Sequence, residues 1–242
     1  GEYEYFDRVH RCWDENGHGK MNMKDALVQS CDIYFYEAVQ KIKLDNLYLR
    51  AEEFGYGQES NIDLPNEMKG RMPNRDFMNK LYGKWGWSKG ALLNIAIGQG
   101  EILSTPVQMA NYINLIATNG DTYPLNLVRT KIDKLNRPQV ELKNWQIIQD
   151  AMRDVVIGEK GTGKLSDPKL PGLSIYGKTG TAENPHGEAH AWYITYGEKN
   201  NEMISIVVLI ENGGSGGTYA TPIARKIYNF YFNSNKSKLA KN

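Results

Sequence analysis

The chain has 242 residues, of which 40% are hydrophobic and 24% are charged, and its formal net charge is +1. This length allows one large domain or two small ones with a sizeable core. A charge this close to zero provides no field for binding nucleic acid or an anionic membrane surface, and no apolar run approaches the roughly 18–20 residues of a transmembrane helix.

The first part of the chain is predicted to contain loops and three helices. Residues 1–21 lack a clear periodicity, which indicates a loop. Residues 58–90 are rich in Gly, Pro, Asn and charge, so we expect a long loop there. Its aromatic cluster of Tyr82, Trp85 and Trp87 favours anchoring of the loop on the core, with a substrate or partner surface as the alternative. Apolar spacing and the Thr105-Pro106 cap signal predict helices over 22–42, 44–54 and 105–118.

The second part of the chain is predicted to be a small antiparallel sheet with helices on either side in the sequence. Apolar periodicity predicts helices from Trp145 to Ile157 and from Tyr219 to Phe232. Runs of alternating or continuous apolar residues predict strands over 174–177, 191–196 and 203–211. Helices followed by three successive strands and a last helix are typical of the α+β class with an antiparallel sheet.

The tetrapeptide Lys178-Thr179-Gly180-Thr181 directly follows the first predicted strand. Lys and Thr supply a cation and a hydroxyl for a substrate carboxylate. Gly allows the backbone to approach closely, and the N–H after it can point at a developing oxyanion. This combination suits an acyl-transfer site, although three residues alone arise easily by chance.

Ser30-Cys31-Asp32 is the second candidate, near the start of a predicted helix. A Ser and an Asp two residues apart can reach one cavity if the helix end lines it. There the Ser can relay a proton, and the Asp can hydrogen-bond a substrate amide or a Lys ammonium. By itself the motif favours a solvated helix turn. Its value comes from the pairing with Lys178.

Together these motifs resemble those of serine enzymes that bind penicillin, which combine S-x-x-K, S-x-N and K-T-G. Further blocks resemble class B penicillin-binding proteins, and Cys12-Trp13, Gly17-His18-Gly19 and Asp32 in place of Asn resemble the elongation type that builds rod-shaped cell wall. These blocks span about residues 12 to 228 and are Phe54–Gly57, Ile62–Pro65, Ile95–Gly100, Ser104–Ala110, His190–Tyr193 and Glu211–Gly214.

The resemblance implies a penicillin-binding/β-lactamase-like transpeptidase fold and a peptidoglycan D,D-transpeptidase that acts through a serine acyl-enzyme. It implies peptidoglycan stem peptides as substrates, β-lactams as inhibitors, cell-elongation membrane proteins as partners and no nucleic acid. It also implies the periplasmic side of the bacterial inner membrane, and no cofactor for catalysis. A non-catalytic cell-wall scaffold and a β-lactam-hydrolysing or β-lactam-sensing relative are the alternatives.

The same resemblance assigns roles to the motif residues. Lys178 sets the electrostatics for proton transfer and for the substrate carboxylate. Thr179 and Thr181 offer hydroxyls to that carboxylate, and the Thr181 N–H is one oxyanion donor. Ser30 shuttles a proton near the leaving amine. Asp32 lacks the N–H donor of the Asn found in many relatives, so its role stays open.

The nucleophilic S-x-x-K motif is expected before Ser30, and no residue there matches it. Ser166-Asp167-Pro168-Lys169 has the right spacing, but its Pro disfavours the helical turn that would align Ser with Lys. We therefore expect residues 1–242 to form a single, N-terminally truncated transpeptidase domain without its own activity. The nucleophile, a pedestal domain and a membrane anchor are expected upstream.

Residues 158–164 match the phosphate-loop pattern G-x-x-x-x-G-K. Such a loop needs Ser or Thr next, a strand before it and a helix after it. Here Leu165 follows and a helical pattern precedes, so a surface loop is predicted.

Cys12, His18 and Cys31 form a candidate metal site with the spacing C-x5-H-x12-C. Thiolates and imidazole suit structural zinc, which usually has four ligands. Asp14 or a residue before Gly1 could be the fourth. A Cys12–Cys31 disulfide and two buried free thiols are the other interpretations.

Overall fold

A computed structural model describes residues 1–242 except 7, 85, 88, 129–133, 135–137 and 234–242. The chain forms two compact units, Gly1–Ile147 and Ile148–Asn242, and each is described by itself. The α+β class is confirmed, because helices accompany antiparallel sheets. The single-domain organisation stays a prediction. Among the helices described, none is both long and apolar enough to cross a bilayer.

The beginning of the chain contains a hairpin that the sequence did not predict. Strands β1 (Glu2–Tyr5) and β2 (Arg8–Arg11) pair antiparallel in residues predicted to be a loop. The strands are four residues each, which is the shortest run over which alternation can indicate a strand. Stacked rings stabilise the hairpin. The ring centroids of Tyr3 and Tyr5 lie 6.0 Å apart, and the Tyr3 ring also lies against that of Tyr36.

The helix predicted over residues 22–42 is two helices, α1 (Met23–Gln29) and α2 (Asp32–Ile42). The break is at Ser30, whose φ of 53° and ψ of 50° place it in the left-handed region. A non-Gly residue in this region ends a helix, as in a C-terminal cap. The prediction of one helix was wrong because apolar periodicity continues across the break.

The long loop predicted over 58–90 contains α4 (Arg75–Tyr82) and leads into α5 (Lys89–Ala96), neither of which was predicted. The Asn74 side chain caps α4, and the Trp87 indole N–H donates to Asn79 at 2.8 Å. Trp85, also predicted as an anchor, lies outside the described residues. The predicted helix over 44–54 is confirmed as α3 (Leu44–Glu53).

Helix α6 (Pro106–Ala117) confirms the capping signal, because Thr105 and Gln108 form a capping box. The buried Gln108 also donates from Nε2 to the carbonyls of Gln58 and Lys69, both at 2.8 Å. One amide therefore closes the base of the loop that precedes α4.

Asp63 joins this loop to a later segment. The backbone N–H groups of Leu127 and Val128 donate to its carboxylate at 2.6 and 2.8 Å, and they lower the pKa of Asp63. A pKa lowered on folding contributes stability above the unfolded-state pKa, and that stability is lost as pH falls through the folded-state pKa. The contacts should therefore hold at neutral pH and be released in acid.

Asp63→Asn should accordingly reduce the amide protection factors of Leu127 and Val128 at neutral pH, since a neutral amide oxygen is the weaker acceptor. The difference from wild type should disappear below the folded-state pKa of Asp63. Hydrogen-exchange NMR across a pH series measures both effects. Equal protection of the two proteins at neutral pH would contradict this account.

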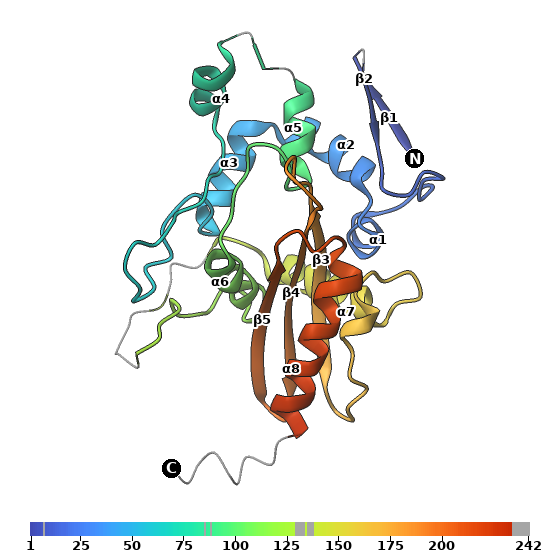
Figure 1. Ribbon diagram of the computed structural model, residues 1–242, viewed down its shortest axis with the longest axis vertical. Helices are drawn as coiled ribbons and strands as arrows, with labels where there is room; N and C mark the ends of the chain where they lie inside the picture. Colours follow the sequence, from blue (N-terminus) through green and yellow to red (C-terminus); the bar gives the residue numbers. More distant parts are fainter. Residues whose placement is uncertain (7, 85, 88, 129–133, 135–137, 234–242) are drawn as a thin grey trace. The chain divides into compact units, whose positions relative to one another are not determined.

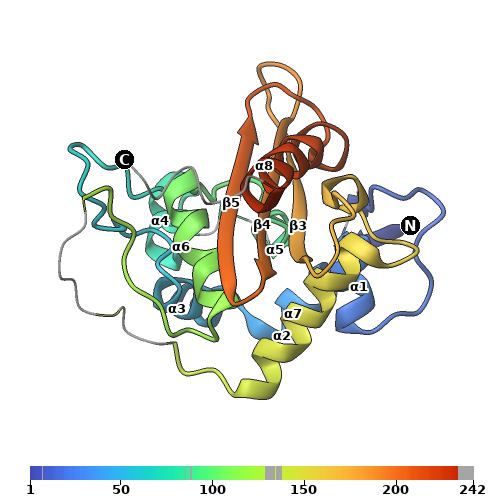
Figure 2. The same ribbon diagram turned by 90° about the horizontal axis from the view of Figure 1, so that it is seen from below.

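The second unit is a sheet in the order β3-β4-β5 with a helix against it. The strands are β3 (Ser174–Ala182), β4 (His190–Lys199) and β5 (Glu202–Ile210), all antiparallel. Helix α8 (Thr221–Asn233) lies along one face of the sheet (Figures 1 and 2). The three strands and the last helix are confirmed, and β3 extends beyond its predicted end to include Lys178–Thr181.

The core of this unit lies between the sheet and α8. It is built from fully buried side chains of both, including Ile175, Tyr193 and Tyr228. Gly177 has a steric reason to be glycine, because a Cβ there would lie 2.2 Å from the Tyr193 hydroxyl. Helix α7 (Leu142–Ile157) precedes the sheet and confirms the helix predicted at 145–157.

Candidate functional site

The tetrapeptide Lys178–Thr181 lies on β3, an outer strand of the three-stranded sheet. Its register is set by β4, with Lys178 opposite Ile194 and Gly180 opposite Trp192. The Lys178 ammonium is half-buried and donates to the Thr179 carbonyl at 2.9 Å. An outer strand can present these residues to a ligand without interrupting the sheet.

Both hydroxyls of the tetrapeptide meet neighbouring segments. Thr179 Oγ1 lies 2.8 Å from Thr162 Oγ1, and Thr181 Oγ1 accepts from the Gly216 N–H at 3.4 Å. Gly216 begins η2 (Gly216–Ala220), a single π-helical turn before α8. A Cβ on Gly216 would lie 2.2 Å from the carbonyl oxygens of Gly180 and Trp192, so glycine permits this close approach.

Ser30 and Asp32 lie on either side of the break between α1 and α2. The Trp13 indole N–H donates to the Gln29 and Ser30 carbonyls at 3.0 and 2.9 Å. The Trp13 backbone N–H donates to Asp32 Oδ2 at 3.2 Å. Asp32 also opens α2, where the helix dipole favours a negative charge. One tryptophan thus fastens the preceding loop to both residues of the motif.

The two candidate groups belong to different units, so their convergence on one cavity stays a prediction. Residues 12–32 bring Ser30 and Asp32 together with Trp13, which sequence reasoning noted only as part of a family block. The position of Trp13 directly after Cys12 was the available signal.

Ser166, from the rejected S-x-x-K match, has a structural role. It is fully buried in η1 (Lys164–Ser166). Its hydroxyl donates to the Gly163 carbonyl at 2.8 Å and accepts from the Tyr193 hydroxyl at 2.7 Å. Burial raises the pKa of Tyr193 to about 12. These contacts occupy the Ser166 hydroxyl and agree with its rejection as a nucleophile.

Cys12, His18 and Cys31 are brought together as the spacing predicted. One ligand atom from each lies within 4.8 Å of the others, and both cysteines are buried and free. Cys12 Sγ lies 3.5 Å from His18 Nδ1, while the buried His18 Nε2 has no hydrogen-bond partner among the described residues. Burial, and secondarily the neighbouring Cys12, raises the pKa of the Cys31 thiol.

The distance between Cys12 Sγ and His18 Nδ1 equals the ligand spacing expected around a tetrahedral zinc ion. Zn–S and Zn–N bonds of about 2.3 and 2.0 Å put the two ligand atoms about 3.5 Å apart, as Cys12 and His18 are. Asp14 does not join the group, and its carboxylate instead accepts from the Asn16 N–H at 3.0 Å.

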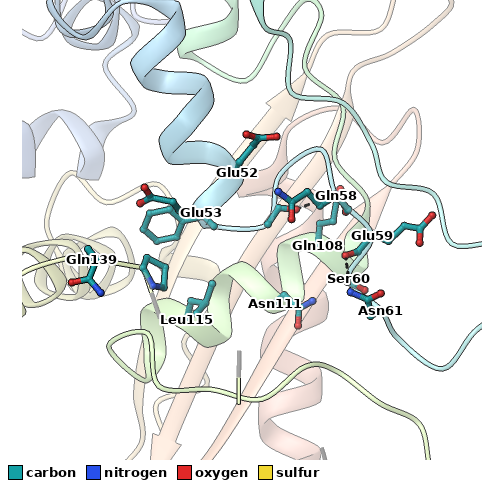
Figure 3. Close-up of a pocket in the computed structure, with 13 residues that line it drawn as sticks. Glu52, Glu53, Gln58, Glu59, Ser60, Asn61, Gln108, Asn111, Leu115 and Gln139 are labelled. Carbon is teal, nitrogen blue, oxygen red and sulfur yellow. Dashed lines mark hydrogen bonds between the residues drawn. The ribbon is translucent and has the colours of Figure 1, made fainter. Parts of the chain in front are cut away.

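A separate pocket of about 590 Å³, with a mixed polar and apolar lining, lies in the first unit (Figure 3). Carboxylates and amides line it, among them Glu52, Glu59 and Gln108. Asn111, on the wall formed by α6, is buried, and within the part of the chain that the structure describes its Oδ1 has no hydrogen-bond partner. The pocket contains none of the predicted catalytic or metal residues.

The chain matches the family model of the penicillin binding protein transpeptidase domain over residues 1–229. It belongs to this family. The transpeptidase domain is 27% identical to the peptidoglycan D,D-transpeptidase MrdA of Haemophilus influenzae, covering 96% of this chain and 39% of that protein. It is 29% identical to the MrdA protein of Acinetobacter baumannii, over 93% of this chain and 37% of that protein.

Solved structures show the same fold. Pseudomonas aeruginosa PBP2 in complex with WCK 5153 is similar with a TM-score of 0.85 and 29% identity, over 95% of this chain and 52% of that one. The complex between PBP2 and MreC from Helicobacter pylori is similar with a TM-score of 0.83 and 29% identity, over 96% of this chain and 44% of that one. The predicted family and fold are therefore confirmed, and the chain spans about two-fifths of the length of its curated relatives.

Proposed function

We propose that the complete gene product containing this chain is a peptidoglycan D,D-transpeptidase that cross-links stem peptides and is acylated by penicillin. The observation that carries the proposal is the family match over residues 1–229, which takes in both Ser30-Cys31-Asp32 and Lys178–Thr181. The similarity to MrdA proteins supports this activity and the role in cell elongation.

In the proposed reaction, a serine outside residues 1–242 attacks the D-Ala-D-Ala carbonyl. The peptide bond breaks, D-Ala leaves and an ester forms on the serine; the amine of a second stem then displaces the serine. Ser30 relays a proton toward the leaving amine, Lys178 and the two threonines hold the substrate carboxylate, and the Thr181 N–H stabilises the oxyanion. Asp32 orients Trp13 and the loop that carries it.

The partners and the location are part of the same proposal. The H. pylori PBP2 was solved in complex with MreC, which supports a cell-elongation membrane protein as a partner. Such an assembly would work at the periplasmic side of the inner membrane.

A labelled penicillin tests the proposal. The complete gene product should be acylated, whereas residues 1–242 alone should not be, because the nucleophile is supplied from outside them. The reading frame should encode Ser-x-x-Lys upstream of Gly1. An upstream sequence without that motif would overturn the proposal and favour the non-catalytic scaffold.

We further propose that Cys12, His18 and Cys31 hold a structural zinc ion. Two buried thiols and an imidazole with an unpartnered nitrogen support this proposal. The ion would lock the Trp13 loop to the turn carrying Ser30, because Cys31 is the next residue. Three ligands come from residues described here, and the fourth is left to water or to another segment.

Purified protein should therefore contain about one zinc ion per chain by elemental analysis, and a strong chelator should lower its melting temperature. His18→Ala should reduce the zinc content severalfold and lower the melting temperature without chelator. His186→Ala, in the loop between β3 and β4, is the matched control and should change neither. Metal-free protein with two titratable thiols would exclude both zinc and a disulfide.

A further inference from the structure

The loop that matches the phosphate-loop pattern is a glycine turn closing α7. Gly163 N–H donates to the Val155 carbonyl at 2.8 Å, so the chain folds back on the last turn of the helix. A Cβ on Gly161 would lie 2.3 Å from the same carbonyl oxygen. The glycines are therefore required by close packing on α7, and they fix the position of the residue between them, Thr162.

Thr162 lies against the tetrapeptide on β3. Its hydroxyl oxygen is 2.8 Å from that of Thr179, and both side chains are half-buried. Its carbonyl oxygen faces Gly217 so closely that a Cβ there would be 2.8 Å away. Among the residues that the structure describes, the two threonine hydroxyls are each other's only side-chain partner.

The direction of this hydrogen bond decides what Thr179 can offer a ligand. A hydroxyl has one proton and two acceptor lone pairs. If Thr179 donates to Thr162, the Thr179 hydroxyl presents only lone pairs to an approaching carboxylate, and these lone pairs repel the carboxylate. If Thr162 donates, the Thr179 proton is left for the carboxylate, and the two bonds in series strengthen each other.

We propose that Thr162 is a positioning residue that donates to Thr179 and thereby sets Thr179 as the donor to the ligand carboxylate. The inference rests on the proposed function, in which Thr179 binds that carboxylate. Thr162 touches no reacting atom and acts through Thr179. The loop at residues 158–164, which matches the phosphate-loop pattern, would then support the carboxylate site.

The test compares benzylpenicillin with its methyl ester, which lacks the carboxylate charge, as acylating agents of the complete gene product. Thr162→Val should lower the acylation rate constant for the acid about tenfold, the scale of one hydrogen bond to a charged group. The rate constant for the ester should change less than twofold. Thr162→Ser should restore the preference for the acid, and Thr218→Val, at an exposed position of η2, is the matched control.

A double-mutant cycle separates positioning from packing. In a Thr179→Val background, Thr162→Val should cause no further loss for the acid. An equal loss for acid and ester, or an unchanged preference in Thr162→Val, would overturn the inference and leave the proposed function intact. Wild-type protein that is not acylated, or that does not prefer the acid, would overturn the proposed function and this inference with it.

Discussion

Lys178→Ala is expected to slow acylation of the complete gene product by labelled penicillin about 10²–10³-fold, the scale of losing one preorganised electrostatic group in an acyl-transfer site. The ammonium is half-buried and held by the Thr179 carbonyl, so it is oriented before a ligand arrives. Under the proposed function, its removal should take away both the cation for the substrate carboxylate and the charge that favours proton transfer.

Two variants make this result specific. Lys226→Ala removes the same charge from an exposed position on α8 of the same unit and should leave the rate within about twofold, since screened surface charges contribute little. Lys178→Arg keeps the charge but changes its shape and should recover only part of the rate. If Lys178→Ala kept the wild-type rate and melting temperature, Lys178 would have no role in the reaction.

Gly216→Ala should destabilise the protein by at least about 2 kcal/mol, the range of overpacked interiors. The added Cβ would meet two backbone carbonyl oxygens, those of Gly180 and Trp192, at 2.2 Å. A side chain could rotate away, but these oxygens belong to paired strands, so η2 itself must move. Because Gly180 is part of the tetrapeptide, acylation should slow along with the loss of stability.

Urea unfolding measures the effect, as a lower midpoint at an unchanged slope. Gly187→Ala is the matched control, because its nearest neighbour, at 3.1 Å, is the end of the Asn212 side chain. That variant should lie within about 0.5 kcal/mol of wild type. A Gly216→Ala protein as stable as the control would mean that η2 does not pack against β3 and β4 this closely.

The parts of the fold predicted correctly carry a complete local signal. The helix after Thr105 has its cap and its proline, and the strands β3 to β5 have sustained apolar runs. The parts of the fold that were not predicted lack a complete local signal. The hairpin strands β1 and β2 have only the minimum length at which alternation indicates a strand, and α4 depends on its Asn74 cap within a polar segment.

In the candidate site, too, the residues with a local sequence signal were predicted and those without one were not. Lys178 and Thr179 were recognisable from residue type and order, and the three candidate metal ligands from their spacing. Trp13 contacts residues that lie 16 to 19 positions later in the sequence, and Thr162 contacts a residue 17 positions later. A pairing across such a sequence distance leaves no periodic pattern. Glycines directly after α7 were the only local sign that the loop carrying Thr162 packs closely.

The left-handed conformation of Ser30 restricts which side chain can serve there. Threonine would supply the same hydroxyl, but β-branched residues are genuine outliers at positive φ. Glycine, asparagine and aspartate suit the backbone but bring no hydroxyl. Geometry and chemistry thus favour serine at this position. Fewer amino-acid types should be tolerated at residue 30 than at an exposed position of α1 such as Asp25.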